Sequence, residues 1–325
     1  MADIGIIFPA YDEAICYFVT ESQNLQLGHR EKLDEASSFS LELVAFDTKT
    51  GVLRYRKQLP AKPRFTLVAV TKDRNLVVRS GDILRLYSPG FEVLKERVLG
   101  TKDYDVWTLK VSPSGSTMLL DHYYPFDTHD EILSTRAFDS LFKFKVEFFP
   151  NSSITDNVLL KSSDTKQIFA SNFASPLEAV PIPKTISCVG DPVLVNDAEV
   201  LNACGQQVTL ISRSGQVLMQ DMLDRKEHLE QLVSLTPDGR FAAVSARQNK
   251  GGFMDYSSIK RSHTRILIYD TELRRRVASV PVEPIPQKDY DFALAPAGDT
   301  LVVMADNSVK AYSVSPQMNF QETVK

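Results

Sequence analysis

A turn of the form Ser/Thr/Ala-Pro-x-Gly recurs along this chain, each time between two short apolar stretches. Three copies are clear: Ser112-Pro113-Ser114-Gly115, Thr236-Pro237-Asp238-Gly239 and Ala295-Pro296-Ala297-Gly298. A degenerate fourth copy is Thr71-Lys72-Asp73-Arg74. A phrase that returns about every forty residues indicates a repeated strand–turn–strand unit, so the chain is predicted to fold from copies of one small sheet.

Alternating apolar residues and β-branched or aromatic runs, bounded by turn residues, fill the intervals between these turns. They predict strands throughout, because no long stretch shows the 3.6-residue period of a helix. Four antiparallel strands, a to d from the centre outward, form one blade of a β-propeller, and the phrase falls at the a–b turn. We predict an all-β, seven-bladed β-propeller of four-stranded antiparallel blades, with about 46 residues per blade, as a single domain over residues 1–325. Six or eight blades remain open, because the middle of the chain has the weakest pattern.

The two ends of the chain decide how such a ring closes. Residues 4–8 read as strand a of the first blade and residues 319–324 as strand d of the last. The ring then closes by face packing between the first and last blades. If residues 4–8 instead complete the last blade, closure is stronger and the blade count changes. The polar segment 221–231 (DMLDRKEHLEQ) is the best helical candidate, and we interpret it as a loop with about one turn of helix.

Residues 236–244 (TPDGRFAAV), followed by residues 266–270 (ILIYD), are similar to the repeat of the WD-repeat-like propellers, which include the TolB, lactonase and quinoprotein-like groups. Residues 43–51 (LVAFDTKTG) resemble the c–d turn of the same repeat. The resemblance implies the propeller fold over most of the chain and says little about activity. True WD repeats carry Gly-His and Trp-Asp dipeptides. Trp-Asp does not occur here, since Trp107 is the only tryptophan and Thr108 follows it, and the one Gly-His pair, Gly28-His29, lies in the long connection at residues 21–40, so the WD hydrogen-bond relay is not predicted.

Composition and charge limit the classes of partner and predict the cellular compartment. A net charge of −4 gives no general attraction for nucleic acid or an anionic membrane, so neither is predicted as a partner. No apolar run approaches the ~18 residues of a membrane span, and the first residues lack a signal peptide, so we expect a cytoplasmic protein. A chain whose export signal has been removed would look the same. Cys16, Cys188 and Cys204 form no CxxC pair. Two alternatives remain open: all three are buried thiols, or Cys188 and Cys204 form a disulfide.

Three connections are long, and each joins strands b and c of its blade: residues 21–40, 122–132 and 246–264. In an antiparallel meander the b–c connections share one end of the propeller with the d–a connections. Insertions are tolerated in loops, where binding groups are usually placed. We therefore take the end that carries the three insertions, around the channel mouth, as the functional surface.

The insertion of the third blade is rich in side chains that carry chemistry. Its candidate binding residues are His122, Tyr123, Tyr124, Asp127, His129 and Asp130. His122, His129, Asp130 and Glu131 are the candidates for a metal site, since His and carboxylate ligands suit Zn, Mn or Fe. Their spacing matches no established metal motif, so no metal is predicted. An aromatic, polar recognition loop is the favoured interpretation.

The insertion of the sixth blade is basic and contains a Gly pair. Its candidate residues for a partner or ligand are Arg247, Lys250, Phe253, Tyr256, Lys260, Arg261 and His263. Such a loop suits an acidic peptide, a phosphate or a carboxylated ligand. The patch is short, and the acidic chain around it argues against nucleic acid.

Two functions follow from these patterns. The first is a non-catalytic propeller that binds a protein, a peptide or a small anionic ligand at the face with the long b–c loops. The alternative is an enzyme of the quinoprotein-like or metal-dependent lactonase or hydrolase type, with its site at the channel mouth. The sequence contains no GxGxxG, GxxxxGK[ST], GxSxG or EF-hand motif, and we predict no cofactor and no catalytic residue.

Overall fold

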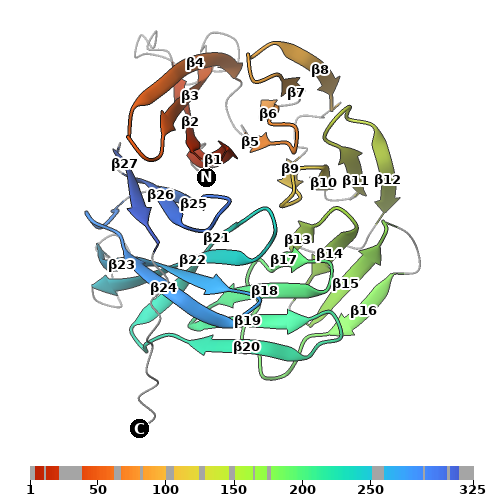
Figure 1. Cartoon of the computed structure of the whole chain (residues 1–325). Helices are drawn as coiled ribbons and strands as arrows, with labels where there is room; N and C mark the ends of the chain where they lie inside the picture. The colour runs from red at the N-terminus through yellow and green to blue at the C-terminus, as the bar shows by residue number, and fades with distance from the viewer. Residues whose placement is uncertain are drawn as a thin grey trace, which may run out of the picture.

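Seven antiparallel sheets follow one another along the chain and stand around a common centre (Figure 1). The computed structural model describes residues 4–10, 12–21, 39–61, 67–80, 83–99, 106–123, 129–145, 151–163, 165–173, 177–250, 260–287, 290–305 and 308–314. Six sheets have four strands in simple chain order, and the seventh has three within these ranges. The seven-bladed β-propeller predicted from the repeat is confirmed, and the fourth strand expected at residues 319–324 lies outside the described residues.

The blades are numbered in chain order. Blades 1 to 4 contain β1 (Ile4–Ala10), β2 (Glu13–Glu21), β3 (Phe39–Asp47), β4 (Leu53–Ala61), β5 (Leu67–Val70), β6 (Leu76–Ser80), β7 (Ile83–Tyr87), β8 (Val93–Val98), β9 (Val106–Val111), β10 (Thr117–Tyr123), β11 (His129–Ser134), β12 (Ser140–Lys145), β13 (Asn151–Ile154), β14 (Val158–Ser162), β15 (Lys166–Ser171) and β16 (Glu178–Pro181). Blades 5 to 7 contain β17 (Val193–Asn196), β18 (Glu199–Cys204), β19 (Gln207–Ser212), β20 (Val217–Met222), β21 (Glu227–Leu235), β22 (Phe241–Lys250), β23 (Lys260–Asp270), β24 (Arg275–Pro281), β25 (Tyr290–Leu294), β26 (Thr300–Ala305) and β27 (Ser308–Ser313).

The recurring phrase forms the a–b turn of blades 3, 6 and 7, as predicted. In each copy the glycine N–H donates a 2.8 Å hydrogen bond to the carbonyl of the first residue of the phrase. Gly115, Gly239 and Gly298 have φ values of 75°, 72° and 72°, a region that side chains disfavour. In blades 3 and 6 a threonine of the c–d turn, Thr135 or Thr271, donates to the carbonyl of this glycine at 2.8 and 2.9 Å. The phrase thus ties the two turns of its blade together.

The apolar core is divided into seven clusters, one at each seam between neighbouring blades. Adjacent residues of a strand serve different seams. Leu120 of β10 packs with blade 2, whereas Leu119 packs with blade 4. Because side chains alternate across a strand, sheets buried on both faces need apolar residues at successive positions. This explains why the middle strands read as continuous apolar runs.

The ring closes between blades 7 and 1 by packing of faces. Ile6, Cys16, Ala293 and Val302 belong to one buried cluster there. The backbone N–H of Ile6 donates to a carboxylate oxygen of Asp291 on β25 at 2.9 Å. No described strand is shared between the two sheets, which agrees with the first of the two closures considered.

Asp291 makes this closure sensitive to pH. Burial raises the pKa of the Asp291 carboxyl from 3.8 to about 6, although backbone N–H groups of Ile6 and Phe292 oppose the rise. The folded state therefore holds the proton more tightly than the unfolded state. Stability conferred by the protonated group is full below about pH 4 and is lost as the pH rises to about 6.

We expect this loss to reach at most about 3 kcal/mol. Chemical denaturation of the wild type and of Asp291→Asn between pH 4 and 7 measures it, because the amide cannot ionise. The wild type should lose stability relative to the variant as the pH rises. A difference between the two proteins that is constant over this range would contradict the prediction.

The segment 221–231 is not a loop with a helical turn, as the sequence suggested. β20 ends at Met222 and β21 begins at Glu227. A register shift between Leu229 and Val233 interrupts the pairing of β21 with β22. Such an irregularity breaks the period-two alternation, so the strand shows no strand pattern in its sequence.

The b–c connections of blades 1, 3 and 6 are shorter than predicted, because their strands extend into them. β10 and β11 pair from Thr117↔Ser134 to His122↔His129. β22 and β23 pair from Phe241↔Asp270 to Lys250↔Lys260. The extensions carry charged and polar residues, some of them buried, such as Asp130 and Glu131, so their sequence lacks the apolar pattern of a strand. The remaining loop tips lie outside the described residues.

Cys188 and Cys204 form a disulfide, with Cα atoms 5.7 Å apart, and Cys16 is a buried free thiol. Of the two possibilities left open by the sequence, the bridge within blade 5 is therefore the one observed. It joins the connection that precedes β17 to the end of β18. None of the described segments is a helix that could cross a membrane.

Candidate functional site

The meander gives the propeller two distinct ends. The turn face carries the a–b and c–d turns, and the hairpin face carries the b–c hairpins and the d–a connections. The hairpins β2–β3, β10–β11 and β22–β23, which hold the three predicted insertions, all belong to the hairpin face by this connectivity. Cavities are present at both ends, and their linings differ in charge.

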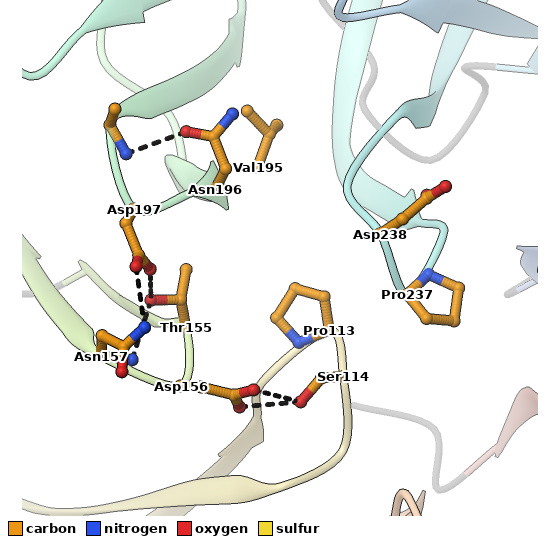
Figure 2. Close-up of a pocket in the computed structure, with 11 residues that line it drawn as sticks. Pro113, Ser114, Thr155, Asp156, Asn157, Val195, Asn196, Asp197, Pro237 and Asp238 are labelled. Carbon is orange, nitrogen blue, oxygen red and sulfur yellow. Dashed lines mark hydrogen bonds between the residues drawn. The ribbon is translucent and has the colours of Figure 1, made fainter.

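On the turn face, a cavity of about 390 Å³ lies between the a–b turns of blades 3 to 6 (Figure 2). Its walls carry three carboxylates and no cationic side chain: Asp156, Asp197 and Asp238. These residues occupy equivalent turns of blades 4, 5 and 6.

Two of these carboxylates link neighbouring blades. Asp156 accepts a hydrogen bond from Ser114 of blade 3 at 2.7 Å. Asp197 accepts hydrogen bonds from Thr155 of blade 4 and, at 2.9 Å, from Asn157. Figure 2 shows both links bridging adjacent turns. Because their oxygens already bond to the preceding blade, these carboxylates fasten the ring at its turn face.

Two candidate metal ligands of blade 3 are buried and ion-paired. Asp130 is 1% exposed, and one of its oxygens lies 2.8 Å from Lys161 Nζ of blade 4. Glu131 Oε2 lies 2.6 Å from Arg97 Nη2 of blade 2, and Glu131 Oε1 lies 3.2 Å from Lys143 Nζ. Burial raises the pKa of Glu131, but hydrogen bonds from Arg97 and other donors bring it below its usual value. Both carboxylates therefore neutralise cations at the seams.

For three other candidates of the blade 3 hairpin the structure gives the position of the backbone, and two more lie outside the described residues. His122 and His129 are directly paired on β10 and β11, and Tyr123 follows on β10. Nothing beyond this placement is described for their side chains. Tyr124 and Asp127 lie outside the described residues. No group of three or more metal-ligating side chains is present in the described part of the chain.

Two predicted arginines of the blade 6 hairpin meet at one carboxylate, Glu230 of β21. Arg247 Nη1 donates to Glu230 Oε1 at 2.9 Å, and Arg261 Nη2 lies 3.4 Å from the same atom. Ser245 donates to Glu230 at 2.8 Å, and the Tyr290 hydroxyl also bonds to it. Burial and the Glu230 charge raise the pKa of Tyr290 above its usual value, so the phenol remains a donor. The network holds both arginines at the seam of blades 6 and 7.

Another cavity, of about 700 Å³, opens on the hairpin face between the connection that follows blade 5 and the blade 6 hairpin. We call it the blade 5/6 pocket. Its lining is mostly charged and polar: Asp224, Arg225, Lys226, Glu227, Gln248, His263 and Arg265.

Hydrogen bonds and an ion pair fix the walls of this pocket. Gln206 Nε2, in the β18–β19 turn, donates to the carbonyls of Asp224 and Glu227 at 3.2 Å each. Arg265 lies 2.6 Å from the buried Glu227 and donates to Ser279 at 3.3 Å. The pocket is therefore built on fixed backbone and on a positioned guanidinium.

The structure distributes the blade 6 candidates over both faces of one hairpin. Arg247 and Arg261 lie toward blade 7, and His263 lines the blade 5/6 pocket. Lys250 and Lys260 are paired across the hairpin. Phe253 and Tyr256 lie outside the described residues.

Sequence reasoning missed six of the seven pocket residues: Arg225, Lys226, Gln248 and Arg265, and the acidic Asp224 and Glu227. The first two fall in the segment that was interpreted as a loop. These two residues could have been predicted to lie on the hairpin face, because a d–a connection lies at the same end of the propeller as the b–c hairpins.

Solved structures share this architecture. The structure is similar to KlHsv2 with loop 6CD replaced by a Gly-Ser linker, at a TM-score of 0.57 and 10% identity, over 97% of this chain and 94% of that one. It is also similar to Kluyvelomyces marxianus Hsv2, at a TM-score of 0.56 and 8% identity, over 86% of this chain and 89% of that one. No family model matches the sequence, and no curated protein is significantly similar to it. At such identities the likeness shows the fold alone. The chain is a seven-bladed β-propeller, and the propeller fold that the resemblance implied is confirmed.

Proposed function

We propose that this protein is a non-catalytic binding propeller that captures an acidic protein segment on its hairpin face. The observation that carries the proposal is the charge of the blade 6 hairpin. Residues 247–265 contain five Arg or Lys residues, one His and a single Asp, in a chain whose net charge is −4. A local basic patch on an acidic body attracts an acidic partner to one place and steers its approach.

The stem of this hairpin is suited to present charge. Ten residues of β22 and eleven of β23 form one long ladder. Glu230 offsets the positive charge of Arg247 and Arg261, the second of which lies next to the last described pair of the ladder. Lys250 and Lys260, farther along the ladder, have no such carboxylate among their described backbone neighbours. The two lysines therefore add two formal positive charges at the last described pair of the ladder.

The test is binding of a fluorescein-labelled glutamate–glycine peptide, followed by fluorescence polarisation, with a lysine–glycine peptide as the opposite charge. We expect the acidic peptide to bind and the affinity to fall as NaCl is raised. The double reversal Lys250→Glu/Lys260→Glu should weaken binding by about tenfold or more, equivalent to ~1.4 kcal/mol.

The matched control reverses two charges at the other end of the propeller. Lys49 and Arg275 are exposed on or beside c–d turns of the turn face. Lys49→Glu/Arg275→Glu makes the same change in net charge and should leave the affinity within about twofold of the wild type. Equal weakening by both double variants would mean that only net charge matters, and it would rule out a binding site on the hairpin.

A further inference from the structure

The blade 5/6 pocket contains more hydrogen-bond donors than the protein itself uses. The side chains of Arg225, Lys226, Gln248 and His263 line it, and no partner for any of them is found among the described residues. Arg265 is bound to Glu227 and Ser279, yet its Nε is buried and has no hydrogen-bond partner. Leaving the buried Arg265 Nε unpaired costs free energy, and the other four side chains are open to a ligand, so the site favours a group that accepts hydrogen bonds.

The charge of the pocket points in the same direction. Glu227 is buried and is neutralised by Arg265, at 2.6 Å. Arg225 and Lys226 are exposed at the rim, and Asp224 is the only other acidic side chain in the lining. The cations that remain therefore exceed the carboxylates that remain, and the excess charge lies next to the unpaired donors.

The pocket is also preorganised. Glu227 N–H donates to the Asp224 carbonyl at 2.9 Å, and Leu229 N–H donates to the Gly205 carbonyl at 2.7 Å. Together with Gln206 these bonds fix the rim turn against the end of β18, where Cys204 is bonded to Cys188. A wall that is already ordered loses little entropy when a ligand binds.

We propose that the blade 5/6 pocket binds the oxyanion group, carboxylate or phosphate, of an acidic peptide segment, with Arg225, Lys226 and His263 surrounding it and Arg265 at its base. The inference rests on the proposed function and makes this pocket the specific anchor within the wider basic face. Planar guanidinium groups suit both oxyanions, whereas the two differ in charge and in the number of acceptor oxygens.

The experiment uses two labelled peptides that differ at one central residue, glutamate in one and phosphoserine in the other, on a neutral glycine–serine background. Both are titrated against the full chain and against Arg225→Ala/Lys226→Ala, which changes only exposed side chains of a turn. We expect binding to the wild type and a loss of about tenfold or more in the variant. Tighter binding of the phosphoserine peptide would identify phosphate as the preferred group, and tighter binding of the glutamate peptide would identify carboxylate.

A second variant keeps the inference separate from the proposed function. Lys250→Glu/Lys260→Glu alters the hairpin without changing any residue that lines the pocket. If this variant loses binding while Arg225→Ala/Lys226→Ala stays within about twofold of the wild type, the pocket is not the anchor, although the hairpin face still binds. If neither peptide binds the wild type while the glutamate–glycine peptide does, the pocket inference fails and the proposed function stands; if the glutamate–glycine peptide does not bind either, or if neither variant changes the affinity, both proposals fail. Gln248→Ala, which removes an uncharged donor, should weaken binding less than the loss of the two cations, and an equal loss from every variant would indicate disruption of the fold.

Discussion

Replacing Gly239 with alanine should lower the free energy of unfolding by about 3–5 kcal/mol, a large effect for the addition of one methyl group. Gly239 has a φ of 72°, which an L-residue adopts only with strain. A Cβ at this position would also overlap the backbone carbonyl of Val195 in blade 5. Backbone cannot move aside as a flexible side chain can, so the seam between blades 5 and 6 would have to open. Urea or thermal unfolding followed by circular dichroism measures the loss.

Gly51→Ala is the matched control for this prediction. Gly51 has a nearly equal φ of 69°, but an added Cβ would meet nothing within 4 Å. Its loss should be about 1 kcal/mol, which reports backbone strain alone. The difference between the two variants measures the close approach of neighbouring blades. Equal losses would show that the glycine of the repeat serves only its own turn.

Lys161→Met should lower the free energy of unfolding by about 3–5 kcal/mol. Lys161 and Asp130 are 4% and 1% exposed, and they form an ion pair between blades 3 and 4. Methionine has a similar length and no charge, so the substitution leaves the Asp130 carboxylate buried without its cation. The cost is that of a buried carboxylate that has lost the cation beside it, and equilibrium unfolding at neutral pH measures it.

The double variant Asp130→Asn/Lys161→Met decides whether charge is the cause. Asparagine removes the charge and preserves the shape, so the double variant should be more stable than Lys161→Met alone. If the double variant is as unstable as the single one or less stable, the loss comes from packing instead. The same pair bears on the metal hypothesis, because a carboxylate that is needed to neutralise Lys161 is not available as a ligand.

The recurring phrase predicted the fold because its glycine is needed for two reasons, the conformation of its own turn and the close approach of the neighbouring blade. Its glycines need a positive φ, and Gly115, Gly239 and Gly298 would each clash with the preceding blade if they carried a side chain. Because both constraints select glycine at the same position of each repeat, the pattern can be recognised from a single sequence. The irregular pairing of β21 was not visible, because its register shift removes the alternation on which strand prediction depends.

The candidate site was predicted in part. The end of the propeller that carries the long connections follows from chain order, and His263 was named among its residues. Arg225 and Lys226 lie about 40 residues before His263 in the chain and were not linked to it, because only packing of blade 5 against blade 6 brings them to one cavity. Arg247 and Arg261 were predicted to bind a partner, and the structure places Glu230 of the same blade against both of them.

The sequence by itself determined the class of fold and the turns that define its blades, since both depend on residue types repeated along the chain, whereas the count of seven blades was chosen among six, seven and eight only by the structure. The tertiary structure alone decided which side chains meet: Asp130 with Lys161 across the seam of blades 3 and 4, Glu230 with two arginines inside blade 6, and Cys188 with Cys204 inside blade 5. Contacts between blades join residues that are far apart in sequence, and no local preference encodes them. They arise when the ring closes and brings the polar ends of neighbouring strands within reach of one another.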